Sequence, residues 1–169
     1  MTRVGFDAAR WLALLVPAAL LAGALGSQYL GGLYPCEMCH WQRWPHYAAL
    51  ALAALAFVPG TPQRYLVALA AVGIAVSGGL GVWHAGIEYG WWQGITTCSS
   101  TVASASGSGG GSIDDVLKRI MAAPITRCDV AQWSFAHISL AGFNALFSLA
   151  GALAIFILLG RGHQPEHTA

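Results

Sequence analysis

Long stretches without a charged residue dominate the pattern of hydrophobic and polar positions along this chain. Charges are absent for 26 residues after Arg10, 20 after Arg43, 23 after Arg64 and 31 after Asp129. A helix rises about 1.5 Å per residue, so about 20 residues suffice to cross a hydrocarbon layer about 30 Å thick. The pattern therefore predicts membrane-spanning helices near 11–30, 41–58, 65–83 and 133–160.

Composition supports a membrane protein. Hydrophobic residues make up 56% of the chain and charged residues 9%, whereas soluble domains carry about 25% charged residues. The formal net charge of +1 gives no electrostatic footprint for nucleic acid. We predict one all-α membrane domain over 1–169, a four-transmembrane-helix bundle in the lipid bilayer. It has a short external loop near 31–40 and a long one near 84–132.

Orientation follows from the positive charges and the cysteines. Arg3 and Arg10 precede the first apolar run as in a signal peptide, but three further spans favour a first transmembrane helix. The density of positive charge in the short segments favours cytoplasmic termini. All four cysteines then fall on the other side, which indicates an oxidising compartment, in a bacterium the periplasm. They are Cys36, Cys39, Cys98 and Cys128.

The long loop near 84–132 divides into three parts. Aromatic residues near its start are typical of a membrane interface, and the Gly/Ser-rich stretch, most marked over 104–112, has the composition of a flexible linker. From Ser112 a short amphipathic helix is predicted, which rests flat on the bilayer or forms an ordinary surface helix. Its apolar face consists of Ile113, Val116, Leu117, Ile120 and Met121.

Two features inside the spans predict helix packing. Gly73, Ser77 and Gly81 recur at intervals of four, which makes a smooth stripe for close helix contact. Asn144 lies inside the fourth span, where an interhelical hydrogen bond is the favoured interpretation over a catalytic role.

The sequence Cys36-Glu37-Met38-Cys39-His40 has several chemical interpretations. As C-x-x-C it is a redox-active dithiol motif, and as C-x-x-C-H it matches an attachment site for c-type haem. A metal site that adds His40 or His46 to two thiolates is a third. A purely structural disulfide here closes too short a loop to remove much entropy.

The pair Cys98 and Cys128 bears on that choice. Alone, the pair favours a stabilising disulfide, because it closes a long loop. Beside a C-x-x-C on the same face, it is the arrangement that disulfide relay requires. A membrane-anchored haem or metal electron carrier has no use for it. A structural or chaperone-like subunit with two inert disulfides is the remaining alternative.

Arg43 follows Cys39 by four residues, so in a helix the two side chains share a face. A positive charge and a helix N-terminus both stabilise a thiolate and lower the pKa of Cys39. The alternative for Arg43 is an interface residue that snorkels to water. Pro45 disfavours helix at Trp44 and predicts a kink just after Arg43.

These residues resemble the DsbB family of disulfide-bond-formation proteins over nearly the whole chain. Relatives of vitamin K epoxide reductase share the four-helix architecture, but in them the loop cysteines precede the C-x-x-C. The matching residues are Pro35-Cys36-Glu37-Met38-Cys39, Gln42-Arg43, Cys98, Cys128 and Gln132-Trp133-Ser134-Phe135, the last expected to open the final helix.

The resemblance implies a multi-pass thiol:quinone oxidoreductase of the bacterial inner membrane. It implies that the protein reoxidises a periplasmic thioredoxin-fold oxidase similar to DsbA and passes the electrons to ubiquinone or menaquinone. Cys98 would form the mixed disulfide with that partner, and Cys128 would be its mate. Cys36 would exchange with the loop pair. We predict no bound metal. The resemblance places Cys39, Arg43 and His84 beside the quinone.

Overall fold

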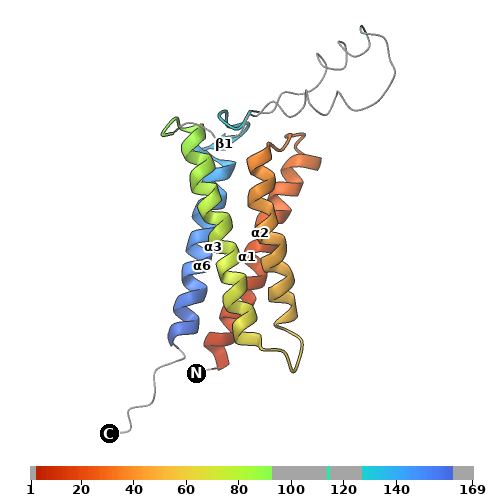
Figure 1. The fold of residues 1–169 in the computed structure, drawn as a ribbon, viewed down its shortest axis with the longest axis vertical. Coiled ribbons are helices and arrows are strands. Elements are labelled where there is room, and N and C mark those ends of the chain that lie inside the picture. The colour runs from red at the N-terminus through yellow and green to blue at the C-terminus, as the bar shows by residue number, and fades with distance from the viewer. Residues whose placement is uncertain (1–2, 93–113, 115–126, 162–169) are drawn as a thin grey trace.

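Four long helices form the part of the chain that the computed structural model describes, residues 3–92, 114 and 127–161. They are α1 (Arg3–Tyr29), α2 (Glu37–Leu55), α3 (Gln63–Glu88) and α6 (Leu140–Arg161). A small antiparallel hairpin precedes α6, with strands β1 (Ser134–Phe135) and β2 (Ile138–Ser139). The start of α1 and the end of α6 lie at one end of the bundle, and β1 lies at the other (Figure 1).

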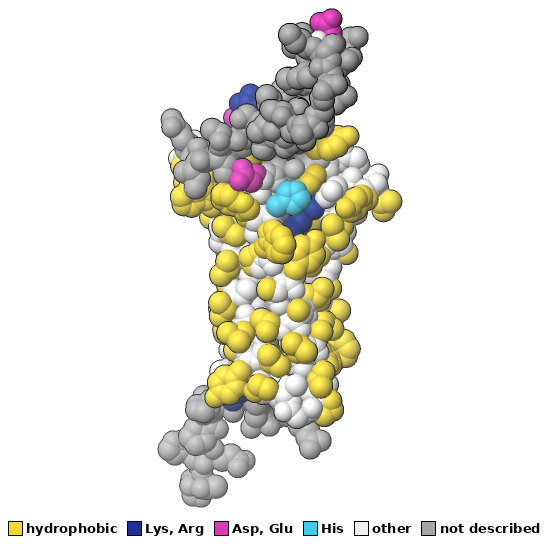
Figure 2. Space-filling view, turned by 45° about the vertical axis from the view of Figure 1, so that its right-hand side comes forward, with side chains coloured by type: hydrophobic (Ala, Val, Ile, Leu, Met, Phe, Trp, Pro, Cys, Tyr) yellow, Lys and Arg dark blue, Asp and Glu magenta, His cyan; other side chains and the backbone are white. Residues whose placement is uncertain are grey.

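Helices α1, α3 and α6 are long and apolar enough to cross a membrane, judged by length and composition. The predicted class, a helical membrane protein, is therefore confirmed. Hydrophobic side chains cover the shaft of the bundle on the face shown in Figure 2. Helix α2, with 19 residues, is not among the three, because polar residues fill its first half. Its role as a fourth span remains a prediction.

The observed helices begin and end at different residues from those predicted. Helix α2 begins at Glu37, before 41, and α3 continues to Glu88, so His84 lies in a helix rather than in a loop. The last helix begins at Leu140, because the β1–β2 hairpin occupies part of the predicted segment near 133–160. The Gln132–Phe135 motif therefore does not open that helix.

Two more expectations concern single segments. Pro45 lies inside α2 and Trp44 is helical, so the expectation that the proline disfavours helix at Trp44 is wrong, whereas the kink just after Arg43 remains a prediction. The predicted surface helix beyond Ser112 and the Gly/Ser-rich stretch 104–112 lie outside the described residues. Asp114 alone is described there, and it is helical and exposed.

The small-residue stripe of α3 is the contact surface for two helices, as predicted. A Cβ atom on Gly73 would lie 3.2 Å from the Pro45 carbonyl oxygen of α2. On Gly81 it would lie 2.9 Å from the Ala145 backbone nitrogen of α6. Ser77, between them, donates a hydrogen bond of 2.7 Å to a carbonyl of α2. At Gly73 and Gly81 even a methyl group would press against the backbone of the neighbouring helix.

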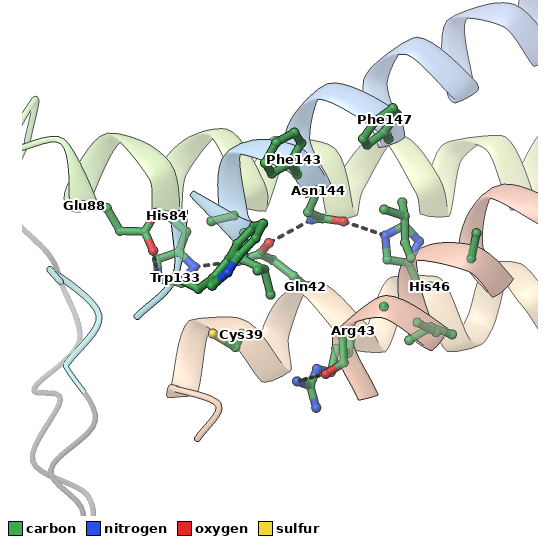
Figure 3. Close-up of a pocket in the computed structure, with 17 residues that line it drawn as sticks. Cys39, Gln42, Arg43, His46, His84, Glu88, Trp133, Phe143, Asn144 and Phe147 are labelled. Atoms are coloured by element: carbon green, nitrogen blue, oxygen red, sulfur yellow. Dashed lines mark hydrogen bonds and ion pairs between the residues drawn. The ribbon is translucent and has the colours of Figure 1, made fainter. Parts of the chain in front are cut away.

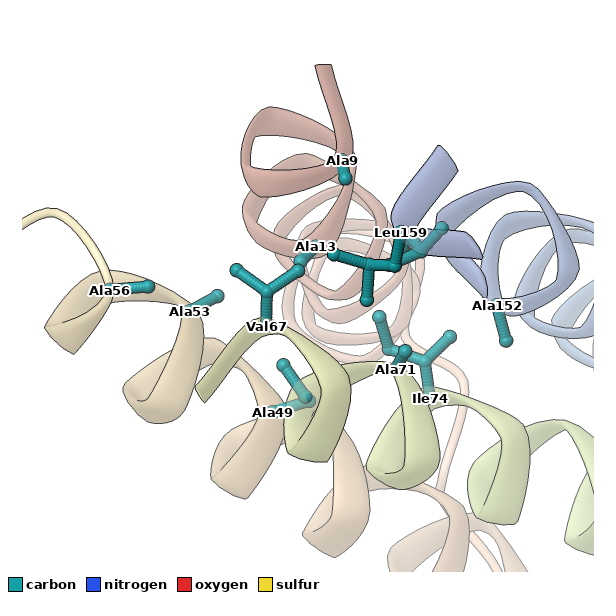
Figure 4. Close-up of a cluster of buried hydrophobic side chains, with 12 residues drawn as sticks. Ala9, Ala13, Ala49, Ala53, Ala56, Val67, Ala71, Ile74, Ala152 and Leu159 are labelled. Carbon is teal, nitrogen blue, oxygen red and sulfur yellow. The ribbon is translucent and has the colours of Figure 1, made fainter. Parts of the chain in front are cut away.

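The core at the end of the bundle where α1 begins and α6 ends is also built from small side chains (Figure 4). All four helices contribute, and alanine predominates, which lets the backbones approach closely as in other membrane bundles. The cluster consists of Ala9, Ala13, Ala49, Ala53, Ala56, Val67, Ala70, Ala71, Ile74, Ala152, Ile155 and Leu159.

Candidate active site

A pair of thiols lies at the N-terminus of α2. Cys36 is the residue that caps the helix, and its Sγ accepts a hydrogen bond of 3.2 Å from the Cys39 backbone N–H. The two Sγ atoms are 2.8 Å apart and carry no disulfide. Cys36 is buried and Cys39 half-buried, so Cys39 is the more accessible sulfur of the dithiol.

The negative charge of this pair belongs on Cys39. The hydrogen bond between the two sulfurs and the burial of Cys36 both raise the pKa of the Cys36 thiol. A thiol that keeps its proton donates to its neighbour, and Cys39 lies in the first turn of α2, where the helix dipole favours an anion. The pair therefore has a protonated, buried member and a more accessible, nucleophilic one.

A third cysteine joins the dithiol. Cys128 is 1% exposed and forms a buried cluster with Cys36, Met38 and Ile87, against which Cys39 also packs. The structure thus brings together three of the four cysteines singled out in the sequence. Cys98, the fourth, lies outside the described residues. The proximity of Cys128 to Cys36 is the arrangement needed for thiol exchange between the loop and α2.

His84, in α3, also lies against Cys36. Its Nε2 is 3.6 Å from Cys36 Sγ and 3.7 Å from Glu88 Oε1, one helical turn further along. Its Nδ1 is 2.7 Å from the side-chain nitrogen of Gln42. The ligand-type atoms of Cys36, Cys39 and His84 all lie within 4.8 Å of one another. His40, which the haem and metal interpretations use, is exposed instead.

Arg43 is buried and tied to α1 rather than extended to water. Its Nη1 donates a 2.6 Å hydrogen bond to Gln28 Oε1, and its Nη2 donates one of 3.2 Å to the Ala24 carbonyl. These contacts exclude the snorkelling interpretation. They hold a positive charge inside the bundle, one turn of α2 beyond Cys39.

A cavity of about 400 Å³ opens beside these residues (Figure 3). Its volume falls within the range of about 300–1,000 Å³ that is typical of small-molecule sites, and most of its wall is apolar. Polar groups come from α2 and α3, namely Cys39, Gln42, Arg43, His46, His84 and Glu88. Trp133, Phe143, Asn144 and Phe147 line another side, with residues 19–24 of α1.

Asn144 joins three helices by hydrogen bonds, as predicted. Its Nδ2 donates to Gln42 Oε1 at 2.8 Å and to the Ser77 carbonyl at 3.2 Å. Its Oδ1 lies 2.9 Å from His46 Nε2. Gln42, His46, His84 and Asn144 in the cavity wall are therefore linked to one another by hydrogen bonds, which lowers the cost of lost hydration for buried polar groups.

Sequence reasoning missed part of this wall. Glu88 follows His84 by four residues and so shares its helix face, a spacing that could have identified it. Phe143 and Phe147 also lie four residues apart, and their rings stack with centroids 6.2 Å apart. In so apolar a helix, however, nothing distinguishes a cavity-lining phenylalanine from one that faces lipid.

The fold and the site together define a helical membrane protein with a buried dithiol beside an apolar cavity. The family model for disulfide bond formation protein DsbB matches residues 7–158. The chain therefore belongs to the DsbB family, and it is an oxidoreductase of disulfide bond formation.

Two relatives show the extent of the similarity. Disulfide bond formation protein B of Marinobacter nauticus is 30% identical over 164 residues, which cover 90% of this chain and 93% of that protein. Uncharacterized protein RP370 of Rickettsia prowazekii is 26% identical over 137 residues, which cover 81% of this chain and 77% of that protein. No solved structure matches the chain at a comparable level of significance.

Proposed function

We propose that this protein is a thiol:quinone oxidoreductase that reoxidises a periplasmic DsbA-like dithiol oxidase. The single observation that carries the proposal is the position of Cys39, a half-buried sulfur in the wall of an apolar cavity inside the bundle. A DsbA-like oxidase is itself a strong oxidant, so its reoxidation requires a still stronger electron acceptor. A membrane quinone, ubiquinone or menaquinone, meets this requirement and is soluble in the bilayer.

The cavity fits such an acceptor in its chemistry. A planar conjugated ring with two carbonyl oxygens needs apolar walls and a few hydrogen-bond donors, and Phe143, Phe147 and Trp133 supply the former. Arg43 is the buried donor with a positive charge, and His84 lines the same wall. The quinone, when bound, would supply an acceptor for two electrons and two protons.

The cysteines would act in sequence, each exchange conserving one disulfide. A thiolate of the partner attacks Cys98 of the Cys98–Cys128 disulfide, and the electron pair of the broken bond passes to Cys128. The Cys128 thiolate then attacks Cys36 of the Cys36–Cys39 disulfide and releases Cys39 as a thiolate. The burial of Cys128 beside Cys36 supports this second exchange.

The proposed placement in the membrane follows the same logic. We place α2 across the bilayer as the fourth span, with both termini cytoplasmic and the cysteines periplasmic, in the bacterial inner membrane. Since the start of α1 and the end of α6 lie at the same end of the bundle, four crossings connect the elements without a re-entrant segment.

The test is an absorption assay of the purified protein in detergent, with a ubiquinone analogue and a reduced DsbA-like protein. We expect catalytic loss of the quinone absorbance, abolished in Cys39→Ala and retained in His40→Ala. His40 is the matched control because it is exposed, lies one residue away and does not line the cavity. Normal turnover by Cys39→Ala would refute the proposal.

A metal- or haem-containing electron carrier is the second candidate function, favoured by the close approach of Cys36, Cys39 and His84. It predicts stoichiometric metal or a haem absorption band in the purified protein. It also predicts electron transfer that survives Cys128→Ser. The thiol:quinone proposal predicts the loss of partner oxidation in that variant, so the same samples separate the two.

A further inference from the structure

Two backbone carbonyls fix the orientation of two amide side chains in the cavity wall, the buried Gln42 and the half-buried Asn144. Asn144 Nδ2 lies 3.2 Å from the Ser77 carbonyl oxygen, and Gln42 Nε2 lies 3.4 Å from the Met38 carbonyl oxygen. A carbonyl only accepts hydrogen bonds, so the atom facing it must be the NH₂ of the amide. The usual ambiguity between the oxygen and nitrogen of an amide is thereby removed at both residues.

The two amides then determine the protonation of His84. With its NH₂ toward Ser77, Asn144 also donates to Gln42 Oε1 at 2.8 Å. Gln42 in turn presents its NH₂ to His84 Nδ1 at 2.7 Å. A ring nitrogen that faces a donor must carry a lone pair. The neutral ring of His84 therefore bears its proton on Nε2.

The surroundings of Nε2 agree with this assignment. Cys36 Sγ lies 3.6 Å away and Glu88 Oε1 3.7 Å away, and the backbone of Cys128 also hydrogen-bonds the ring. Sulfur and the carboxylate accept hydrogen bonds, so an N–H at this position has partners, whereas a lone pair would have fewer. The proton of His84 is directed to the place where Cys36 meets the loop.

We propose that Gln42 and Asn144 are positioning residues that hold His84 as its Nε2–H tautomer, so that it stabilises Cys36 as a leaving thiolate. The inference rests on the proposed function, in which Cys36 exchanges with the loop. When a thiolate attacks Cys128 of a Cys36–Cys128 disulfide, a new bond forms on Cys128 and the electron pair of the broken bond remains on Cys36. The Nε2–H group donates a hydrogen bond to the Cys36 thiolate and stabilises its charge, and no proton leaves the ring.

A second histidine provides an internal reference for the hydrogen-bond chain from Asn144 through Gln42 to His84. Asn144 Oδ1, an acceptor, lies 2.9 Å from His46 Nε2, so His46 also carries its proton on Nε2. Loss of Asn144 thus affects both histidines, whereas loss of Gln42 affects His84 alone. Ser148 hydrogen-bonds Asn144 Oδ1 at 3.2 Å and lies 3.3 Å from His46 Nε2, but it takes no part in the contact to His84. Ser148→Ala is therefore the matched control for the His84 ring.

The experiment is ¹⁵N NMR of histidine rings in the reduced full-length protein in detergent, with resonances assigned from His46→Gln and His84→Gln. We expect the Nε2–H tautomer at both rings in the wild type, and at His84 in Ser148→Ala. In Gln42→Met the His84 signals should shift to a tautomer mixture while His46 is unchanged. In Asn144→Leu both rings should change. A mixture, or an Nδ1–H tautomer at His84, in the wild type would overturn the assignment.

The role in exchange is tested with the quinone assay. We expect Gln42→Met to lower kcat about tenfold with the KM for the reduced partner within twofold, since this hydrogen-bond chain acts on Cys36. The double variant with Asn144→Leu should be no slower than Gln42→Met, because both changes act through one contact. An altered tautomer with unchanged kcat would overturn the role. NMR needs neither quinone nor partner, so failure of the proposed function would leave the assignment separately testable.

Discussion

A close contact between α3 and α6 predicts a large difference in stability between substitutions at two glycines that lie two residues apart. A Cβ on Gly81 would lie 2.9 Å from the Ala145 nitrogen, 3.0 Å from Asn144 Nδ2 and 3.1 Å from the Ala141 carbonyl oxygen. Two of these three atoms belong to the backbone and cannot rotate away. Gly81→Ala therefore forces the helices apart. A Cβ on Gly79 meets nothing within 4 Å, so Gly79→Ala is the matched control.

The expected difference in melting temperature between the two variants follows from two opposing effects on stability. Both substitutions gain helix propensity of about 1 kcal/mol, which cancels in the comparison. Overpacking of a well-packed contact costs about 1–3 kcal/mol, and only Gly81→Ala incurs it. For a chain of this size, 1 kcal/mol corresponds to about 2–4 °C in Tm. Gly81→Ala should thus melt about 2–12 °C below Gly79→Ala, as measured by the loss of helical circular dichroism in detergent. Equal melting temperatures would refute the close contact.

Three further predictions concern the site and the hairpin. Arg43→Leu should raise the KM for quinone about tenfold or more, whereas Arg43→Lys, which keeps the charge, should raise it less; equal values would contradict a charge effect. Limited alkylation of the reduced protein near pH 7 should modify Cys39 before Cys36, because hydrogen bonding and burial raise the pKa of Cys36. Peptide mass mapping checks this, and equal modification of the two thiols would contradict it. Ala136 and His137 have positive φ angles of 50° and 64°, so Ala136→Asn with His137→Gly should raise the Tm, as suits a tight hairpin turn.

The helices were predictable because each depends on local sequence. Runs without charge predicted α1, α3 and α6 to within several residues, since the cost of burying charge in lipid acts residue by residue. The hairpin before α6 was not predictable in the same way. It depends on Tyr89 of the α3 C-terminus, whose hydroxyl donates to the His137 carbonyl and accepts from the Ser139 N–H at 3.0 Å. Such a contact spans about fifty residues, and no local pattern encodes it.

The candidate site likewise has features that local sequence predicts and features that it does not. The C-x-x-C motif and Arg43 are local to one helix, so their spacing alone indicated a reactive dithiol with a nearby charge. The partners of these residues come from elsewhere: Gln28 from α1, and His84 and Glu88 from α3. The sequence showed these residue types without showing which of them meet. His84 entered through family resemblance, whereas Glu88 did not enter at all.

Helix α2 is more polar than the three apolar helices, and the location of its polar residues explains how it can still lie within a membrane bundle. Its polar side chains Gln42, Arg43 and His46 are buried, and each has a hydrogen-bond partner on another helix. Its exposed face carries Trp41, Trp44 and Tyr47 instead, residue types enriched where protein meets the membrane interface. Polar groups inside a bilayer are tolerated when they face the bundle interior and are paired, and they then mark function. The mean hydropathy of α2 is therefore low because its polar residues line the cavity of the proposed site, and this distribution supports its placement as the fourth span.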